Sequence, residues 1–257
     1  MRKAIAAAAA DLLDALLDRY CPGCGGALPR GGAVCATCDA RVPRTGVALC
    51  LRCLHGSPST EESPGGGCPR HGRARLLLSG PVFEPPLDLI LHTFKYEGGS
   101  SLAPWIGSLL PEPPGLGDAL GREYILVPVS LHPARRAWRG FDQALLLACG
   151  ASARWGIPVV EAVSRTRDHE PQARLDPERR RRNVTGAFSV RCPAAVRGRP
   201  VLLVDDVATT GSTLLAAAEA LETAGAEWIL SLTAAHGGLP DSPNARASFE
   251  LRSDRGS

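Results

Sequence analysis

The stretch VLLVDDVATTGST at residues 201–213 decides the fold that we expect of the chain. Its first four residues are apolar and half of them are β-branched, which predicts a buried strand of a parallel sheet. Two carboxylates, Asp205 and Asp206, come where we expect that strand to end, and an alanine- and leucine-rich helix opens at Ser212. This order of strand, acidic pair, small loop and helix is typical of α/β proteins that bind a ligand at the carboxyl edge of the sheet.

The loop after the acidic pair has the composition of a phosphate site. Its backbone N–H groups and those of the helix start can bind an anion, and glycine allows a close approach. Carboxylates repel phosphate but accept hydrogen bonds from vicinal hydroxyls, so loop and pair together predict a sugar phosphate. The alternative is an ordinary strand-to-helix turn with a polar cap. The loop residues are Ala208, Thr209, Thr210, Gly211, Ser212 and Thr213.

Residues 21–71 contain four short motifs in which two metal-binding residues are separated by two others, C-x2-C three times and C-x2-H once. We call each motif a knuckle, and the four knuckles form two consecutive pairs. Each pair offers four ligands, which predicts two tetrahedral zinc sites, one with four cysteines and one with three cysteines and a histidine. The segment has almost no apolar core, so metal or disulfides must replace the missing burial. His55 competes for the eighth position, and the knuckles can pair in adjacent or crossed order. The expected ligands are Cys21, Cys24, Cys35, Cys38, Cys50, Cys53, Cys68 and His71.

Positive charge is concentrated in one part of the chain. The net charge is +3, yet residues 131–199 hold 14 arginines, no lysine and 6 acids, so this part carries +8 and the rest −5. Such a segment indicates a polyanionic partner, either pyrophosphate or nucleic acid. Within it, Ser130–Gly140 is expected to be a basic loop after a buried strand. Residues 164–183 are expected to be a long polar loop that leads into a short basic helix and acts as a lid over the site, the alternative being a disordered connector.

The remaining elements follow from hydrophobic periodicity and turn signals. We expect helices at 4–20, 87–96, 141–153 and 213–223, and strands at 124–129, 157–163, 186–190 and 228–235. Cys149 is expected in the core. No apolar run approaches the roughly 20 residues of a membrane span, and Asp11, Asp14 and Asp18 exclude a signal peptide, so we expect a cytoplasmic protein.

The whole layout resembles the ComF family, whose members join a double zinc ribbon to a type I phosphoribosyltransferase domain. The resemblance rests on the knuckles, ILHTFKYEG at 90–98, VPVSLHPARRAWRGFDQA at 127–144, PQARLDPERRRRNVTGAF at 171–188 and the stretch at 201–213. Asp142 stands where the family usually has Asn, and His71 where it usually has Cys. The expected fold is therefore α/β, a phosphoribosyltransferase-like parallel sheet flanked by helices and preceded by a small zinc-ribbon module.

The resemblance covers about residues 21–235 and implies a double zinc ribbon (21–75) followed by a phosphoribosyltransferase-like domain (76–238). Hydrophobic spacing predicts an N-terminal amphipathic helix (1–20), and composition predicts a flexible tail (239–257). The resemblance also implies that Asp205 and Asp206 bind the ribose of phosphoribosyl pyrophosphate (PRPP), which carries Mg²⁺, and that 208–213 hold its 5′-phosphate. Pyrophosphate would lie against Ser130, Arg135, Arg136 and Arg139. The acceptor base is unknown. The alternatives are a competence factor that binds single-stranded DNA and a PRPP-sensing regulator without turnover.

Overall fold

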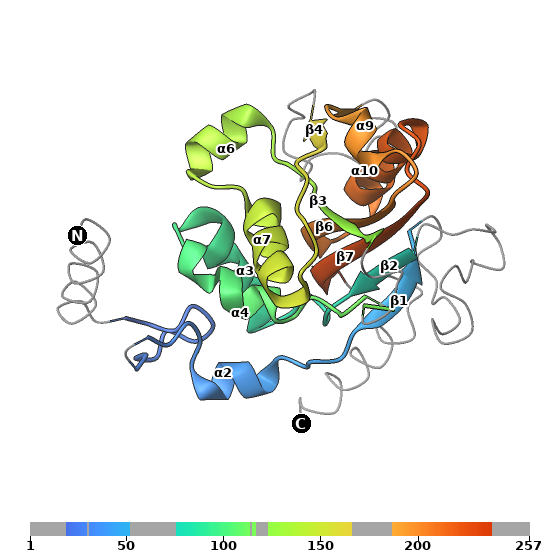
Figure 1. Ribbon diagram of the computed structural model, residues 1–257. Coiled ribbons are helices and arrows are strands. Elements are labelled where there is room, and N and C mark those ends of the chain that lie inside the picture. Colours follow the sequence, from blue (N-terminus) through green and yellow to red (C-terminus); the bar gives the residue numbers. More distant parts are fainter. Residues whose placement is uncertain are drawn as a thin grey trace, which may run out of the picture.

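The fold is built on a five-stranded, mostly parallel sheet with the strand order β1-β2-β7-β6-β3 (Figure 1). The computed structural model describes residues 19–29, 31–51, 76–113, 115–116, 123–165 and 187–237. The strands of this sheet are β1 (Val47–Cys50), β2 (Leu76–Ser79), β3 (Ile125–Pro128), β6 (Pro200–Ala208) and β7 (Trp228–His236). A separate antiparallel pair comprises β4 (Val163–Arg165) and β5 (Phe188–Val190).

Helices cover both faces of the sheet (Figure 1). One face is packed by α3 (Leu87–Tyr96), α4 (Ala103–Gly107) and α7 (Gln143–Trp155), and the other by α10 (Ser212–Thr223). The remaining short helices are α2 (Ala36–Arg41), η1 (Ser100–Leu102), α6 (Pro133–Arg139) and α9 (Pro193–Val196).

The central strand β6 shows why the sequence folds in three layers. Its side chains alternate between the two faces, so Leu202 and Val204 pack beneath α3, α4 and α7, while Val201 and Leu203 pack beneath α10. All four are fully buried. A strand that is buried on both faces needs a continuous apolar run, and the sequence provides one.

The parallel register brings the ends of the central strands to one edge of the sheet. Strand β6 pairs with β3 from Val201↔Ile125 and with β7 as far as Ala208↔His236. It therefore continues through Asp205 and Asp206, which we had expected just beyond its end. The backbone pairing with β7 accounts for the difference, because it holds the chain extended up to the small loop.

Strand β1 lies in the cysteine-bearing part of the chain and nevertheless belongs to the main sheet. It pairs antiparallel with β2, from Val47↔Ser79 to Cys50↔Leu76. Its Leu49 is buried in the same apolar cluster as Leu77 of β2. This strand was not predicted from the sequence, because its four residues directly follow a polar, proline-containing connection.

Two expectations for the helical and strand segments are corrected. Cys149 is exposed, because α7 buries the stripe formed by Leu147, Ala148 and Ala151 and the thiol lies off that stripe. The expected strand 157–163 reduces to one bridge, Leu126↔Val159, before β4 begins. Pro158 cannot donate to a ladder, which limits pairing here. No helix among the described residues is long and apolar enough to cross a membrane.

Candidate functional site

The acidic pair lies near the carboxyl end of β6 and is held by two polar contacts. The backbone N–H of Asp206 donates to Asp205 Oδ1 at 2.8 Å. The Asp206 carboxylate forms an ion pair with Lys95 on α3, with 3.0 Å between Nζ and Oδ2. Both partners are largely shielded from solvent, so the pair joins α3 to the centre of the sheet.

Neighbouring charges set the protonation of these groups. Burial raises the pKa of Asp205 to about 8, and the adjacent negative charge of Asp206 acts in the same direction. Burial alone would lower the pKa of Lys95, but the carboxylate of Asp206 outweighs it and the pKa is raised. Lys95 therefore stays charged, while Asp205 holds its proton more tightly than an exposed carboxyl does.

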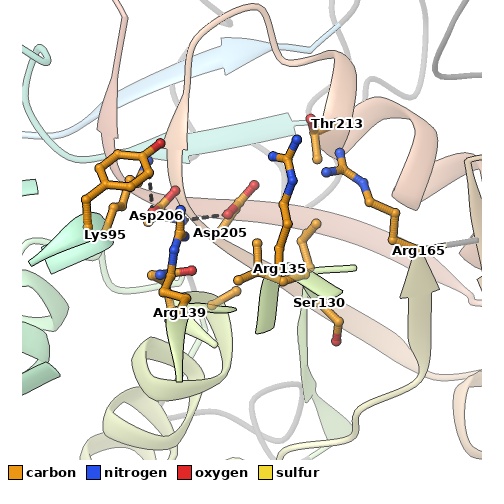
Figure 2. Close-up of a pocket in the computed structure, with 13 residues that line it drawn as sticks. Lys95, Ser130, Arg135, Arg139, Arg165, Asp205, Asp206 and Thr213 are labelled. Atoms are coloured by element: carbon orange, nitrogen blue, oxygen red, sulfur yellow. Dashed lines mark hydrogen bonds and ion pairs between the residues drawn. The ribbon is translucent and has the colours of Figure 1, made fainter. Parts of the chain in front are cut away.

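The acidic pair forms part of a pocket of about 170 Å³, which we call the acidic-pair pocket. Figure 2 shows cationic side chains from several elements around the two carboxylates, with Lys95 and Thr213 on opposite sides of them. An anionic ligand would meet fixed positive charge, and hydroxyls would meet the acids. The lining residues are Lys95, Tyr96, Val129, Ser130, Leu131, Arg135, Arg139, Gln143, Ala144, Arg165, Asp205, Asp206 and Thr213.

The predicted pyrophosphate residues divide into two groups. Ser130, Arg135 and Arg139 line the acidic-pair pocket, whereas Arg136 turns away and its Nη1 pairs with Glu161 Oε2 at 3.2 Å. The segment is also not a plain loop. Residues Pro133–Arg139 form α6, which begins with proline at its first turn and ends at Gly140 with φ of 81°. Adjacent arginines on a helix point in different directions, which explains the division.

The start of α7 fixes the other end of this basic segment. Asp142, buried to 3% exposure, caps the helix, because its Oδ1 accepts from Leu145 N at 3.2 Å. Its Oδ2 accepts from Leu131 N at 2.9 Å. One carboxylate therefore positions both the helix and the residue after Ser130. Asp142 thus acts as a positioning residue, and both of its carboxylate oxygens accept a hydrogen bond, whereas an Asn side chain has only one acceptor oxygen.

The predicted phosphate loop has a small pocket of its own, about 20 Å³ in volume. Gly211 adopts a φ of 68° as the N-cap of α10 and provides no side-chain cap. A side chain is disfavoured in this left-handed conformation. The N–H of Ser212 makes a long contact, 3.5 Å to Thr210 Oγ1, and a helix start of this kind can bind an anion. All six predicted loop residues, 208–213, line this pocket together with Asp205, and Thr213 lines both pockets.

Sequence reasoning missed three polar residues of the pocket: Lys95, Gln143 and Arg165. Lys95 lies four residues after Leu91 on a helix with a well-defined apolar face. Its position at the edge of that face could therefore have been predicted from the sequence. Nothing in the sequence indicated that this face meets β6. Gln143 is only 2% exposed, which periodicity within α7 could have suggested but not explained.

Four cysteines form a compact cluster at the other end of α3. The sulfurs of Cys21, Cys24, Cys35 and Cys38 all lie within 4.8 Å of one another, so the adjacent order of knuckles holds for the first predicted site. The Sγ atoms of Cys24 and Cys35 are 3.7 Å apart. Sulfurs bound tetrahedrally at about 2.3 Å are about 3.8 Å apart, so the cluster fits one metal ion and a zinc module.

The pKa values of two of these thiols bear on whether the cluster binds a metal ion. Burial acts to raise the pKa of Cys21, but hydrogen bonds from the backbone N–H groups of Cys35 and Gly23 outweigh it and lower the pKa to about 7. Burial raises the pKa of Cys38. Four thiolates cannot share this volume without a cation. The four thiols are not joined in disulfides, which was the alternative.

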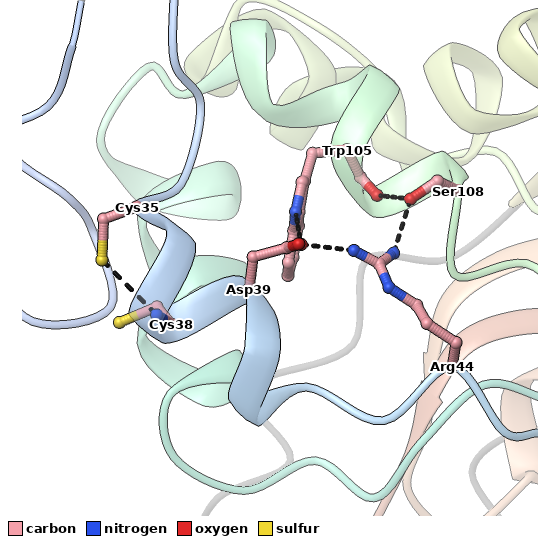
Figure 3. Close-up of polar contacts among 6 residues, drawn as sticks. All are labelled: Cys35, Cys38, Asp39, Arg44, Trp105 and Ser108. Atoms are coloured by element: carbon pink, nitrogen blue, oxygen red, sulfur yellow. Dashed lines mark hydrogen bonds and ion pairs between the residues drawn. The ribbon is translucent and has the colours of Figure 1, made fainter.

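The cluster is attached to the main domain by a polar network (Figure 3). Asp39, the residue after Cys38, accepts a hydrogen bond from Trp105 Nε1 on α4 at 2.6 Å and pairs with Arg44. Arg44 Nη1 in turn donates to Ser108 Oγ at 2.7 Å. The knuckle also abuts the start of α3, because a Cβ on Gly23 would lie 3.0 Å from Pro86 Cβ. The cysteine cluster is therefore packed against the start of α3 and joined by hydrogen bonds to α4.

The second predicted metal site falls mostly outside the described residues, as do His55, the 1–18 segment, most of 164–183 and the tail from 238. Cys50 is described and lies fully buried in β1. Its partners Cys53, Cys68 and His71 are not described, so the second site stays a prediction.

Comparison with known proteins agrees with this geometry. Residues 153–249 match the phosphoribosyl transferase domain family. The DNA utilization protein YhgH of Escherichia coli O157:H7 is 36% identical over 203 residues, which cover 75% of this chain and 86% of that protein. Competence protein F of Haemophilus influenzae is 29% identical, with 70% and 75% covered. The chain belongs to the ComF family.

This ComF protein also aligns with one solved structure of a larger enzyme. That structure is the allosteric regulatory enzyme of purine biosynthesis, at 18% identity and a TM-score of 0.34. The alignment covers 53% of this chain and 26% of the enzyme, so the ComF chain spans about a quarter of it. The phosphoribosyltransferase-like fold thus rests on the matched domain and on the parallel sheet described above.

Proposed function

We propose that this ComF protein binds Mg-PRPP in the acidic-pair pocket and transfers its phosphoribosyl group to a nucleobase-like acceptor. The observation that carries the proposal is the acidic pair, set between a glycine-containing helix start on one side and arginines on the other. The ribose hydroxyls would be held by Asp205 and Asp206, and the 5′-phosphate by 208–213. PRPP has each of these groups in this order.

The chemistry then requires charge stabilisation more than a protein nucleophile. The bond between ribose C1 and the pyrophosphate oxygen breaks, and pyrophosphate leaves with the electron pair. A ring nitrogen of the acceptor bonds to C1 and its proton passes to solvent. Arg135 and Arg139 would stabilise the leaving charge. Mg²⁺ bound with PRPP would neutralise part of the pyrophosphate charge.

For the cysteine cluster we propose a structural zinc ion at Cys21, Cys24, Cys35 and Cys38. All four positions are filled by protein sulfur, so no site remains open for a substrate. A cluster of reduced thiols accords with our expectation of a cytoplasmic protein. A second zinc ion at Cys50, Cys53, Cys68 and His71 remains part of the proposal.

The test is calorimetric titration with Mg-PRPP of the wild-type chain and of the double variant Asp205→Asn, Asp206→Asn. We expect binding by the wild type and none by the double variant, since amides cannot replace two charged acceptors of ribose hydroxyls. Circular dichroism checks that the variant is folded, and Glu161→Gln controls for lost surface charge. Equal affinity in wild type and double variant would refute the ribose assignment.

A second function is favoured by what the relatives are called. One is named for DNA utilization and another for competence. On that view the chain handles single-stranded DNA or senses PRPP without turnover. DNA binding would weaken steeply with added salt, because phosphate contacts release counterions. Release of pyrophosphate from PRPP in the presence of a base would decide for the enzyme.

A further inference from the structure

An exposed aromatic pair reaches the acidic-pair pocket through one of its members, Tyr96. Tyr96, at the end of α3, lines the pocket and is 52% exposed, and Trp138 of α6 is 72% exposed. Their ring centroids are 6.4 Å apart with an interplanar angle of 56°. Large aromatic side chains left in water beside a ligand pocket are a feature of sites that receive a planar ring.

A cation completes this surface. The guanidinium carbon of Arg139 lies 4.9 Å from the Tyr96 ring centroid, within the range of a cation–π contact. His92 approaches the same ring with 4.9 Å between centroids. The Tyr96 ring is thus held in place by neighbours from two helices while about half of its surface stays open. A fixed, open aromatic face is suited to stacking, because little conformational freedom is lost on binding.

The pocket wall beside this face contains hydrogen-bond donors that lack acceptors. Gln143 is 2% exposed, and its Nε2 meets no acceptor among the described residues. The buried Nε of Arg139 likewise meets none within the described part of the chain. Buried polar atoms are almost always paired, so two unpaired donors in one pocket indicate that a ligand provides the acceptors.

The direction of the bound sugar places these groups at the reacting carbon. Figure 2 shows Thr213 and Lys95 on opposite sides of the acidic pair. If the 5′-phosphate lies at the loop of Thr213, the ribose would extend across the acidic pair and its C1 end would face the side of Lys95. Tyr96 follows Lys95 in α3 and lines the same pocket. The incoming ring must approach C1, so the open aromatic face lies where the acceptor has to be.

We propose that Tyr96, Trp138 and Gln143 form the acceptor subsite, which takes a free heterocyclic base stacked on Tyr96. The proposal rests on the proposed function, because it uses the PRPP orientation given above. Since the unpaired Nε2 of Gln143 is a donor, the base should present an acceptor at the edge that faces it. A 6-oxopurine is therefore preferred over a 6-aminopurine, which offers a donor at the same position.

The experiment uses hypoxanthine and adenine, which have the same purine skeleton and differ at position 6. Each is titrated into the full-length protein, with and without Mg-PRPP, and tryptophan fluorescence and pyrophosphate release are recorded. Stacking near Trp138 should quench fluorescence, and Trp138→Phe should retain binding by calorimetry while losing most of that quench. We expect hypoxanthine to bind at least about fivefold more tightly than adenine.

Three variants separate the roles. Tyr96→Ala should weaken both bases by about fivefold or more, and it should weaken PRPP by a smaller factor, through the lost contact with Arg139. Gln143→Leu should remove the preference for hypoxanthine while adenine binding changes little. Tyr20→Ala removes a tyrosine that is 61% exposed but lines a different cavity, and should change nothing.

The outcomes are distinguishable. If Mg-PRPP binds but neither base does, or if Tyr96→Ala binds both bases as the wild type does, the acceptor subsite is wrong and the proposed function stands. If only a single-stranded oligothymidylate quenches Trp138, the surface serves nucleic acid and the subsite is also wrong. If Mg-PRPP itself does not bind, the proposed function fails, whatever the bases do.

Discussion

At the scale of single residues, burial and the neighbouring Asp206 make ionisation of Asp205 unfavourable in the folded protein. Its folded pKa of about 8 is well above the value of about 3.9 for an unfolded chain. Between these two values the folded state binds more protons than the unfolded state, so stability falls as the pH rises through this window. A group kept in place at such a cost is typical of a ligand site.

The variant Asp205→Asn should therefore be more stable than the wild type at pH 8, although it should lose PRPP. Because the side chain keeps some contact with solvent, we expect a gain of only about 1–2 kcal/mol. The gain should shrink as the pH falls towards 4 and vanish below it, where the wild-type carboxyl is protonated in both the folded and the unfolded state. Urea denaturation at pH 5 and pH 8 measures it. A gain that is equal at both pH values would contradict the raised pKa.

Arg135 and Arg136 offer a second test at this scale, because they are adjacent, equally charged and on one helix. Only Arg135 lines the acidic-pair pocket, while Arg136 pairs with Glu161. Arg135→Gln should weaken PRPP binding about tenfold or more, as expected for loss of a charged contact to phosphate. Arg136→Gln should leave it within about twofold. Calorimetry that finds equal losses would show that net charge, and not position, matters.

At the scale of elements, the site depends on how helices are joined to the strands that precede them. Asp142 accepts from Leu145 N in α7 and from Leu131 N in the segment after β3. Ser130 is adjacent to Leu131, so this carboxylate sets the position of a pocket residue without lining the pocket itself.

Replacing this cap should cost stability in a graded way. Asp142→Ala removes both acceptors and should lower the free energy of unfolding by about 1–3 kcal/mol, since a buried N–H is left unpaired. Asp142→Asn keeps one acceptor oxygen and should lose less. Chemical denaturation gives both values, and hydrogen exchange at Leu131 N locates the effect. If the alanine variant were no less stable than the asparagine variant, the cap would not support this segment.

At the scale of the whole molecule, the cysteine cluster and the acidic-pair pocket are connected through α3. The knuckle packs against Pro86 at the start of this helix, and Lys95 near its end pairs with Asp206. The network of Asp39, Arg44 and Trp105 joins the same knuckle to α4. A metal ion bound by the four cysteines would therefore be expected to stabilise the helical layer that covers one face of the sheet.

Removing the metal should then destabilise the entire chain. Metal analysis of the wild type is expected to find two zinc ions, and Cys38→Ser should reduce this to one and lower Tm by more than about 5 °C. Cys149→Ser changes an exposed thiol outside the cluster and is the matched control. Retention of two zinc ions by Cys38→Ser would refute the ligand assignment.

The sequence predicted those parts of the site that are contiguous or regularly spaced. The acidic pair with its loop and the first two knuckles could be read directly, because local geometry follows from local residues. Lys95, Gln143 and Arg165 could not be, since each reaches the pocket through tertiary packing. The division between Arg135 and Arg136 also required α6, which the sequence presented as a loop. Strand β1 was missed because four residues carry too little periodicity.

Strand β1 has a practical consequence for anyone who wishes to divide the protein. Its four residues cover the outer edge of β2, and they come from the cysteine-bearing part of the chain. A fragment starting at residue 76 would expose the N–H and C=O groups of Leu76–Ser79 as a flat, apolar border. Exposed strand edges of this kind pair with the edges of other chains, and the protein then aggregates. A truncation that retains only the phosphoribosyltransferase-like part would thus be expected to aggregate, and an assay of it would not test the proposed activity.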